Sequence, residues 1–444
     1  MSSIKTLTIK RFAQIENISL GFGDLTVLVG AQGTGKSLAL QWLKVAIDGK
    51  QVVSALKDAG QQTSKSAELV DLIFGVGMGP ALKSNTRVEF DSRQVSPASI
   101  NRIGSGIQRM FFIPAHRSML ISDGWAAPFQ KLTSETPVVA RIFSQNLFDR
   151  FSAKGGDQLF PLKKLLKKEI RDLINKAVYH DGKVGLDQDQ QHTKRLKLTH
   201  GSANLPFMTW TTGQREFTPL LLGLYHLLPK VTIRKREDID WVVVEEPEMG
   251  LHPQALTAFM LLVLDLLWRG YRVVLSTHSS HVLTCVWMLQ RLKENNARWQ
   301  LLLEAMEAGN SGAMKAVALS AMEKKYCVYL MEYGPDGKVH SSDISGLDPN
   351  SENEIEAGWG GLTGFSSRFG DAVRKSVIEQ DEKQDSRSVH SKQRKASSSK
   401  KGGTLKPSKV NPEEQVVAEK LAEVQIGNVA KEKVKGEKTD VTEK

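Results

Sequence analysis

Residues 30–37, which read GAQGTGKS, have the types and spacing that phosphate chemistry needs. They match the Walker A pattern G-x-x-x-x-G-K-[ST], and they follow an apolar run, LTVLV, and precede a helix-forming stretch. Glycines let backbone N–H groups surround phosphate oxygens, and the start of the following helix adds its positive dipole end. Lys36 is placed to reach the β- and γ-phosphates and Ser37 to hold Mg²⁺. The candidate nucleotide-binding residues here are Gly30, Gln32, Gly33, Thr34, Gly35, Lys36 and Ser37.

A second segment, residues 241–248, is an apolar run that ends in carboxylates, WVVVEEPE. A metal–triphosphate site needs one carboxylate near the metal and another to orient or deprotonate the attacking water. Glu245 is the candidate for the magnesium shell and Glu246 the candidate for the water. The alternative, an acidic loop that caps the next helix, is disfavoured by the Walker A pattern in the same chain.

Two further segments carry weaker signals. His278 follows the apolar run at 272–276, where an imidazole can hydrogen-bond a γ-phosphate, although a lone histidine at such a place is more often structural. Thr211, Gly213 and Gln214 stand just before an apolar helix pattern, and such a helix start can face phosphate. From these residues alone, an ordinary capped helix is the better interpretation.

The surrounding patterns indicate the elements that position these side chains. Strands are expected at 5–10, 25–29, 87–90, 110–113, 241–244, 272–276 and 327–332. Helices are expected from residue 36 and over 135–151, 162–177, 214–228 and 253–267. Strands that alternate with helices predict an α/β fold with a largely parallel sheet.

The composition of the 444 residues excludes several classes of protein. Hydrophobic residues make up 40% and charged residues 25%, which suits a buried core. No apolar run reaches the ~20 residues of a membrane span, and the first residues lack the apolar core of a secretory signal. Two cysteines, Cys285 and Cys327, are too few for a disulfide framework or a zinc finger. We therefore expect a cytoplasmic protein without a membrane span.

The chain is expected to divide at about residue 380. Residues 1–380 read as one folded domain, and 381–444 as a basic, low-complexity, disordered tail with a candidate short helix at 412–433. More than half of the net charge of +11 lies beyond residue 382, so it is weak evidence for a nucleic-acid groove in the folded part. The segment 125–205 contains a basic run, which is interpreted as a solvated helix face in preference to a DNA or partner contact. The run comprises Lys163, Lys164, Lys167, Lys168 and Arg171.

Taken together, these motifs resemble the ABC-type ATPases of the RecF/SMC group, and most closely the compact ATPases of the overcoming-lysogenization-defect (OLD) family. The resemblance rests on residues 4–37, 211–221, 242–253 and 273–283, with 110–118 in the place of the family's Q-loop. It implies a P-loop NTPase of the ABC-ATPase type with ATP and Mg²⁺ as cofactors.

The resemblance also implies a role for each candidate residue. Glu245 takes the Walker B metal position together with Ser37, Glu246 is the catalytic glutamate, and His278 is the switch histidine. Thr211 and Gly213, with Gln214 beside them, belong to a signature motif that contacts the γ-phosphate bound to the opposite subunit. A head-to-tail homodimer closed by two ATPs follows from that last role.

The sequence departs from the family pattern in several places. Thr211 replaces the usual signature serine, Gln32 replaces a common asparagine, and His116 or Arg117 stands where a Q-loop glutamine is expected. The separation between Lys36 and Glu246 is too short for a long coiled-coil arm, so the insertion at about 125–205 is expected to be a compact helical lobe. No TOPRIM-type acidic cluster follows His278, so a nuclease would have to be a separate protein.

The leading functional hypothesis is an ATP-hydrolysing switch that dimerises around ATP and controls a partner. DNA, or an effector in phage defence or DNA repair, is the candidate partner. Two alternatives stay open: an energy-coupling subunit of a transporter, and a non-hydrolysing scaffold held together by ATP. The intact Glu246 and His278 argue against the scaffold.

Overall fold

The computed structural model describes residues 5–122, 124–152, 158–162, 165–188, 194–229, 235–349, 351–362, 369 and 372–376. The chain divides into two units, 1–369 and 370–444, and the large sheet and its helices belong to the first. The predicted tail, 381–444, and the short helix expected at 412–433 lie outside the described residues.

A ten-stranded mixed sheet organises the first unit, in the order β5-β4-β1-β2-β16-β15-β3-β14-β13-β6. Five neighbouring strands, β15, β3, β14, β13 and β6, run parallel to one another. Antiparallel pairing joins β1 to β2 and β4, β4 to β5, and β15 to β16. The strands are β1 (Lys5–Phe12), β2 (Ile15–Phe22), β3 (Leu25–Val29), β4 (Leu82–Phe90), β5 (Arg93–Gln94), β6 (Met110–Ile113), β13 (Trp241–Glu245), β14 (Arg272–Ser276), β15 (Tyr326–Tyr333) and β16 (Val339–Asp343).

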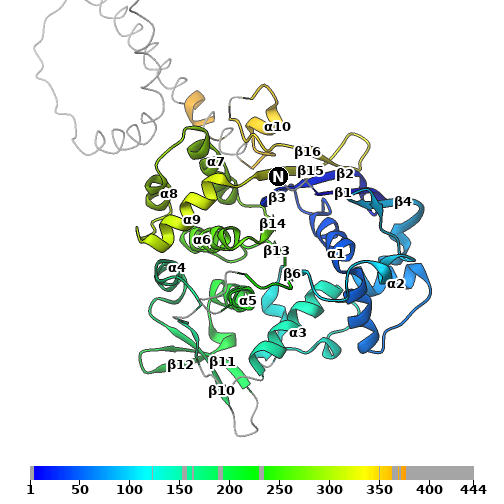
Figure 1. Cartoon of the computed structure of the whole chain (residues 1–444), viewed down its shortest axis with the longest axis horizontal. Helices are drawn as coiled ribbons and strands as arrows, with labels where there is room; N and C mark the ends of the chain where they lie inside the picture. The colour runs from blue at the N-terminus through cyan, green and yellow to red at the C-terminus, as the bar shows by residue number, and fades with distance from the viewer. Residues whose placement is uncertain are drawn as a thin grey trace, which may run out of the picture. The chain divides into compact units, whose positions relative to one another are not determined.

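Helices cover both faces of the parallel strands, as Figure 1 shows. Alternate residues of β3 therefore point into two different cores: Val27 packs with the helices of one face and Leu28 with those of the other. Burial on both faces explains why β3, β13 and β6 read as unbroken apolar runs instead of alternating patterns. The two cysteines are buried and unbonded, one in each core.

The helices lie in chain order between the strands. They are α1 (Lys36–Asp58), α2 (Ser66–Phe74), α3 (Val138–Ser152), α4 (Lys168–Ile174), α5 (Thr212–Leu227), α6 (Pro253–Arg269), α7 (Ser280–Glu294), α8 (Trp299–Ala305), α9 (Gly312–Glu323) and α10 (Glu354–Ala357). α1 packs on one face, α5, α6, α7 and α9 on the other, and α3 contributes side chains to both cores. None of the described helices is long and apolar enough to cross a membrane.

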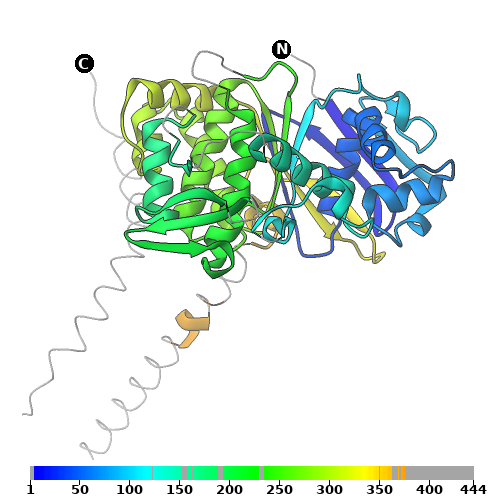
Figure 2. The ribbon, with the colours of Figure 1, turned by 90° about the horizontal axis from the view of Figure 1, so that it is seen from below.

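The insertion at 125–205 differs from the expected helical lobe. It contains α3 and α4, but it also contains a four-stranded antiparallel sheet in the order β12-β11-β10-β9, seen apart from the large sheet in Figure 2. A two-stranded ribbon, β7 (Ile121–Ser122) and β8 (Trp125–Ala126), leads into it. The added strands are β9 (Gln158–Phe160), β10 (Lys183–Gln188), β11 (Lys194–His200) and β12 (Ala203–Pro206). The alternation of β11, with Leu196 and Leu198 buried, is a strand signal that the helical interpretation overlooked.

The basic run of the insertion is tied down in part. Lys167 forms an ion pair with the buried Asp265 of α6, and its ammonium lies 4.0 Å from the centre of the Trp268 ring. Arg269 shares the same carboxylate at 2.8 Å. Lys167 therefore joins the insertion to α6 and does not lie on the solvated helix face that was expected. Lys163 and Lys164 lie outside the described residues.

Candidate functional site

The strand order brings three of the predicted segments to one edge of the sheet. β3, β14 and β13 are consecutive parallel neighbours, so their carboxyl ends meet. The phosphate loop follows β3, His278 comes two residues after β14, and Glu246 comes directly after β13. β14 lies between β3 and β13 in the sheet. His278, which follows β14, therefore lies between Lys36, which follows β3, and Glu246, which follows β13. Residues more than 200 positions apart in the chain are thus assembled at one site.

The loop between β3 and α1 has the backbone that its glycines predict. Gly30 has a φ of 143°, and a Cβ there would lie 2.1 Å from the carbonyl oxygen of Met331, so only glycine fits. Thr34 is buried and donates its hydroxyl to the Ala31 carbonyl at 2.8 Å, which closes the loop on itself. Gln32 lies at the exposed apex.

Lys36 points back into this loop. Its ammonium donates to the carbonyl oxygens of Gly30 at 2.8 Å and Ala31 at 2.9 Å. Burial lowers the pKa of Lys36 to about 8, although the negative charges of Glu246 and Glu248 oppose the shift. A positive charge is therefore held at the centre of a turn that is open on its outer side, where an anion would complete its coordination.

Two side chains from distant segments hold the apex of the loop. Gln14, in the turn between β1 and β2, donates to the Gly33 carbonyl at 2.8 Å, and Tyr333, the last residue of β15, donates its hydroxyl to the same oxygen at 3.1 Å. Neither residue is part of a recognisable sequence motif. Tyr333 is 300 positions from Gly33 and stands in no motif, so only the pairing of β15 with β3 could have revealed it.

Glu245 and Ser37 form a place suited to a divalent cation. Glu245 is the last residue of β13 and is 4% exposed; burial raises the pKa of its carboxyl, and the nearby Ser37 side chain opposes that shift. One carboxylate oxygen accepts from the Ala115 amide at 3.3 Å, and the other has no hydrogen-bond partner among the described residues. A buried carboxylate oxygen without a partner is costly, and a cation bound between it and the nearby hydroxyl would offset that cost.

Magnesium fits this pair better than a metal held by protein ligands alone. Among the described residues, no group of three histidine, cysteine or acidic side chains is arranged to hold a metal ion. Mg²⁺ usually binds through one or two protein ligands and completes its shell with water and substrate phosphates. Glu245 and Ser37 would hold the ion, and it would neutralise charge on the phosphates.

Glu246 is held in an uncommon backbone conformation. Its φ is 41°, in the left-handed region that a glutamate rarely adopts, and its amide donates to the Ser276 carbonyl at 2.9 Å. Its carboxylate is 3.6 Å from the Nε2 atom of His278. Strained backbone of this kind persists only where the surroundings determine it, and it often marks a functional position.

Glu248 is a site residue to which the sequence analysis gave no role. One of its carboxylate oxygens accepts from the His278 amide at 2.5 Å, and the other is buried without a hydrogen-bond partner in the described part of the chain. Its negative charge acts on Lys36 together with that of Glu246. Glu248 therefore fixes the backbone of the histidine and adds negative charge near the lysine.

The segment after β6, where the resemblance placed a Q-loop, contains an arginine that faces away from solvent. Arg117 begins the 3-10 turn Arg117–Leu120 after β6 and is 0% exposed. Its guanidinium donates to the carbonyl oxygens of Glu245 at 2.7 Å and Glu246 at 3.2 Å. His116 precedes it with a φ of 49°. Of the two residues considered for this position, Arg117 is the one that contacts the acidic strand end.

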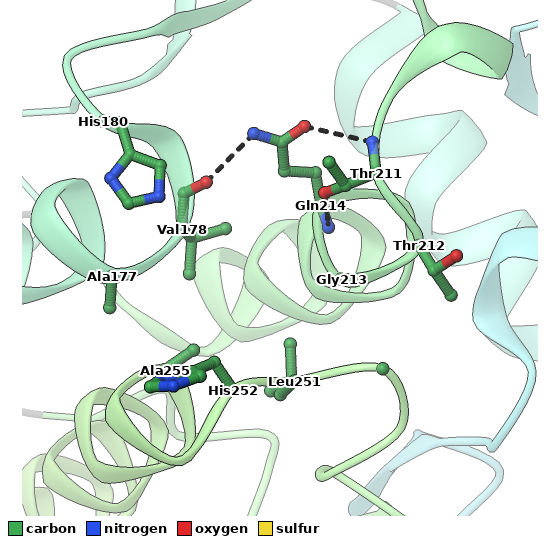
Figure 3. Close-up of a pocket in the computed structure, with 11 residues that line it drawn as sticks. Ala177, Val178, His180, Thr211, Thr212, Gly213, Gln214, Leu251, His252 and Ala255 are labelled. Carbon is green, nitrogen blue, oxygen red and sulfur yellow. Dashed lines mark hydrogen bonds between the residues drawn. The ribbon is translucent and has the colours of Figure 1, made fainter.

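Thr211, Gly213 and Gln214 are not beside Lys36 but line a separate pocket of about 370 Å³ (Figure 3). Thr211 caps α5: its hydroxyl accepts from the Gln214 amide at 3.3 Å, and the Gln214 side chain accepts from the Thr211 amide at 3.2 Å. A Cβ on Gly213 would lie 2.7 Å from the Gly250 carbonyl, so this glycine permits close packing. The ordinary capped helix is thus present, and its first turn opens into a pocket.

The far side of that pocket comes from two other segments. His252, which caps α6, and His180, which ends the π-turn Asn175–Tyr179 after α4, are the titratable side chains among the described residues that line it. Gln214 also donates to the Val178 carbonyl at 3.0 Å, as the dashed line in Figure 3 shows. The insertion therefore forms part of this wall, which the motifs alone did not predict.

A comparison with known families matches one stretch of the chain. Residues 132–284 match the family described as "AAA domain, putative AbiEii toxin, Type IV TA system". The matched stretch contains Thr211, Glu246 and His278 and begins after the phosphate loop. No curated protein matches the chain. The family match and the loop geometry together support a P-loop ATPase domain.

Solved structures that resemble the chain are distant from it. An SMC head bound to the C-winged helix domain of ScpA is 12% identical with a TM-score of 0.38, over 77% of this chain and 97% of that one. The SMC head domain from Thermotoga maritima is 12% identical with a TM-score of 0.34, over 77% and 98%. The cbiO1 subunit of the Clostridium perfringens ABC transporter complex cbiONQ is 12% identical with a TM-score of 0.28, over 62% and 80%. The roles proposed below therefore rest on the chain's own geometry.

Proposed function

We propose that this protein binds and hydrolyses Mg-ATP and uses the cycle as a dimeric switch, in the manner of OLD-like and RecF-like ATPases. Lys36 and the amides of residues 30–37 bind the phosphates, and Ser37 with Glu245 holds Mg²⁺. Glu246 orients or deprotonates the attacking water, and His278 senses the γ-phosphate. ATP supplies the phosphoryl group that is transferred to water.

The observation that carries this proposal is the convergence of Lys36, Glu245, Glu246 and His278 at the ends of three adjacent parallel strands. Each of the four has a feature that solvent-facing loops rarely show: a buried ammonium, a buried carboxylate, a left-handed glutamate, and a histidine amide held by Glu248. Perturbed or strained groups gathered in one place are a mark of catalytic sites.

The place of the signature residues supports the proposed dimer. Thr211 and Gly213 line a pocket whose described lining residues include none from the loop 30–37. In one chain they would not contact the nucleotide held by Lys36. A second copy, placed head to tail, would bring its nucleotide to this pocket, where the start of α5 offers amide groups.

For the output of the switch, we propose a bound partner, either DNA or an effector of phage defence or DNA repair. The family match is to a domain described as a putative AbiEii toxin, which is consistent with a defence role. Because function depends on the site and not on the fold, this output is the part that experiment must decide.

The first experiment measures ATP hydrolysis by the purified protein, with and without duplex DNA, beside the Lys36→Ala variant. We expect turnover that Lys36→Ala abolishes, with ATP affinity weakened by about 100-fold because a charge-assisted phosphate contact is lost. Lys57→Ala, an exposed lysine on the same helix, is the matched control and should behave as wild type. Stimulation by DNA would favour the RecF-like output, and equal turnover in Lys36→Ala would refute the assignment of the site.

The pKa of Lys36 predicts how ATP affinity depends on pH. In the free protein the pKa is lowered to about 8, and bound phosphates would raise it, so binding takes up a proton above pH 8. Affinity should be constant between pH 7 and 7.5 and fall as the pH rises through 8, to about tenfold weaker at pH 9. Calorimetric titration with ATP from pH 7 to 9.5 tests this. Lys36→Arg keeps its charge, so any binding that it retains should not fall over this range.

A further inference from the structure

Arg117 is a buried cation that the ATPase roles above do not use. It lies between two parts of the proposed machinery: the acidic end of β13 and the helix α5. Its side chain is 0% exposed, and burying a guanidinium is costly unless every part of it is engaged. The contacts of Arg117 therefore indicate what it holds in place.

On one side, Arg117 holds the backbone of the strand end. It donates to the carbonyl oxygens of Pro114 at 2.9 Å, Glu245 at 2.7 Å and Glu246 at 3.2 Å. The Glu246 amide is held from the other direction by the Ser276 carbonyl. Both peptide groups that flank the strained Glu246 are thus fixed, and a planar fork of donors is well suited to reach several carbonyls at once.

On the other side, the same guanidinium reaches α5. Its Nε atom donates to the Glu216 carbonyl at 3.4 Å and is 4.0 Å from the Glu216 carboxylate, which is 5% exposed. The Ser118 hydroxyl donates to that carboxylate as well. Glu216 is one turn after Thr212, so it stands on the helix whose first turn carries Thr211 and Gly213.

We infer that Arg117 is a positioning residue that fixes the backbone of Glu246 and joins it rigidly to α5. This inference rests on the proposed function. Glu246 serves the nucleotide bound to its own chain, whereas the start of α5 faces the nucleotide of the second copy. Through Arg117 and Glu216, a change at one nucleotide is passed to the signature residues that contact the other.

The test compares turnover and ATP affinity in Arg117→Lys, Glu216→Gln and the double variant. A lysine cannot reach all these carbonyls as a fork does, so we expect Arg117→Lys to lower kcat about 100-fold and Glu216→Gln about 10-fold. ATP affinity should stay within twofold in both, because neither side chain lies at the phosphate loop. The double variant should lose no more than Arg117→Lys alone, since the two residues act as one unit.

Arg109→Lys is the matched control. Arg109 also joins the β6 side of the sheet to the segment before β13, through Asp240 and the Glu237 carbonyl, but at the amino ends of these strands. It should keep the kcat of the wild type. Two results would overturn the inference: a kcat within threefold of wild type in Arg117→Lys, or losses in kcat that multiply in the double variant. If Arg117→Lys does not fold, an unchanged kcat in Glu216→Gln would overturn it.

A second readout does not depend on turnover. Amide hydrogen exchange in the absence of nucleotide should be faster in Arg117→Lys at both 246–249 and 212–216, and unchanged at both in Arg109→Lys. Faster exchange at only one of the two segments would show that Arg117 does not join them. The proposed function fails differently: the wild type itself would neither bind ATP nor hydrolyse it.

Discussion

Replacing Glu246 with glutamine is expected to lower kcat by about 1,000-fold while ATP still binds. A positioned general base contributes about 10²- to 10⁴-fold to rate, and an amide cannot accept the proton from the attacking water. The substitution keeps the shape of the side chain and should leave the Lys36–phosphate contacts unchanged. Single-turnover hydrolysis and ATP titration on the same protein sample measure both quantities.

The same variant distinguishes the hydrolysing switch from the non-hydrolysing scaffold. A dimeric switch that cannot hydrolyse ATP should accumulate as an ATP-bound dimer, visible by size-exclusion chromatography with light scattering. A scaffold that uses ATP without hydrolysis would give the same oligomer in wild type and variant. Glu237→Gln, an exposed glutamate before the start of β13, is the control and should change neither turnover nor oligomeric state.

The local parts of the site could be predicted from the sequence because they lie within short segments. The spacing of residues 30–37 dictates a loop whose glycines adopt positive φ, and the structure has that loop between β3 and α1. The apolar runs at 241–244 and 272–276 became β13 and β14 within one residue. Buried parallel strands have a strong signal, since both faces must be apolar.

The contacts that hold the site together could not be predicted, because the residues that make them are distant in sequence. Tyr333 and Gln14 bind one carbonyl of the phosphate loop, and Arg117 binds carbonyls of the acidic strand end. Backbone acceptors leave no pattern in a sequence, so an arginine that binds carbonyls looks like any other arginine. The register of β15 beside β3, set by tertiary packing, decides the first contact.

The insertion shows a different limit of sequence reading. Its strands are short and partly amphipathic, and short apolar runs fit a helix or a strand about equally well. Leu196 and Leu198 face the core on one side of β11 while Lys197 pairs with Asp187 on the neighbouring strand. Alternation over so few residues is a weak strand signal, and the pairing of β11 with its neighbouring strands is what makes it decisive.

A buried ion pair joins α1 to the sheet, and its loss should strongly destabilise the fold. Asp48 is 1% exposed and its carboxylate accepts from the Lys44 ammonium at 2.6 Å. It also accepts from the amides of Arg109 and Met110, both at 2.9 Å, where β6 begins. Asp48 interrupts the helical geometry of α1 with φ −119° and ψ 25°, so the kink and the strand start share one anchor.

Asp48→Ala should therefore lower the free energy of unfolding by about 3–5 kcal/mol, because it leaves a buried ammonium and two backbone amides without their carboxylate. Burial lowers the pKa of Lys44, and in the wild type the negative charge of Asp48 opposes that shift. Asp48→Ala removes this opposing charge. The unfolded chain then binds more protons than the folded one, so the stability of the variant should rise between pH 7 and 10. Urea unfolding at several pH values measures both effects. Glu68→Ala, which breaks the exposed pair with Lys65, should leave the free energy of unfolding almost unchanged. An equally small loss in Asp48→Ala would show that the anchor is dispensable.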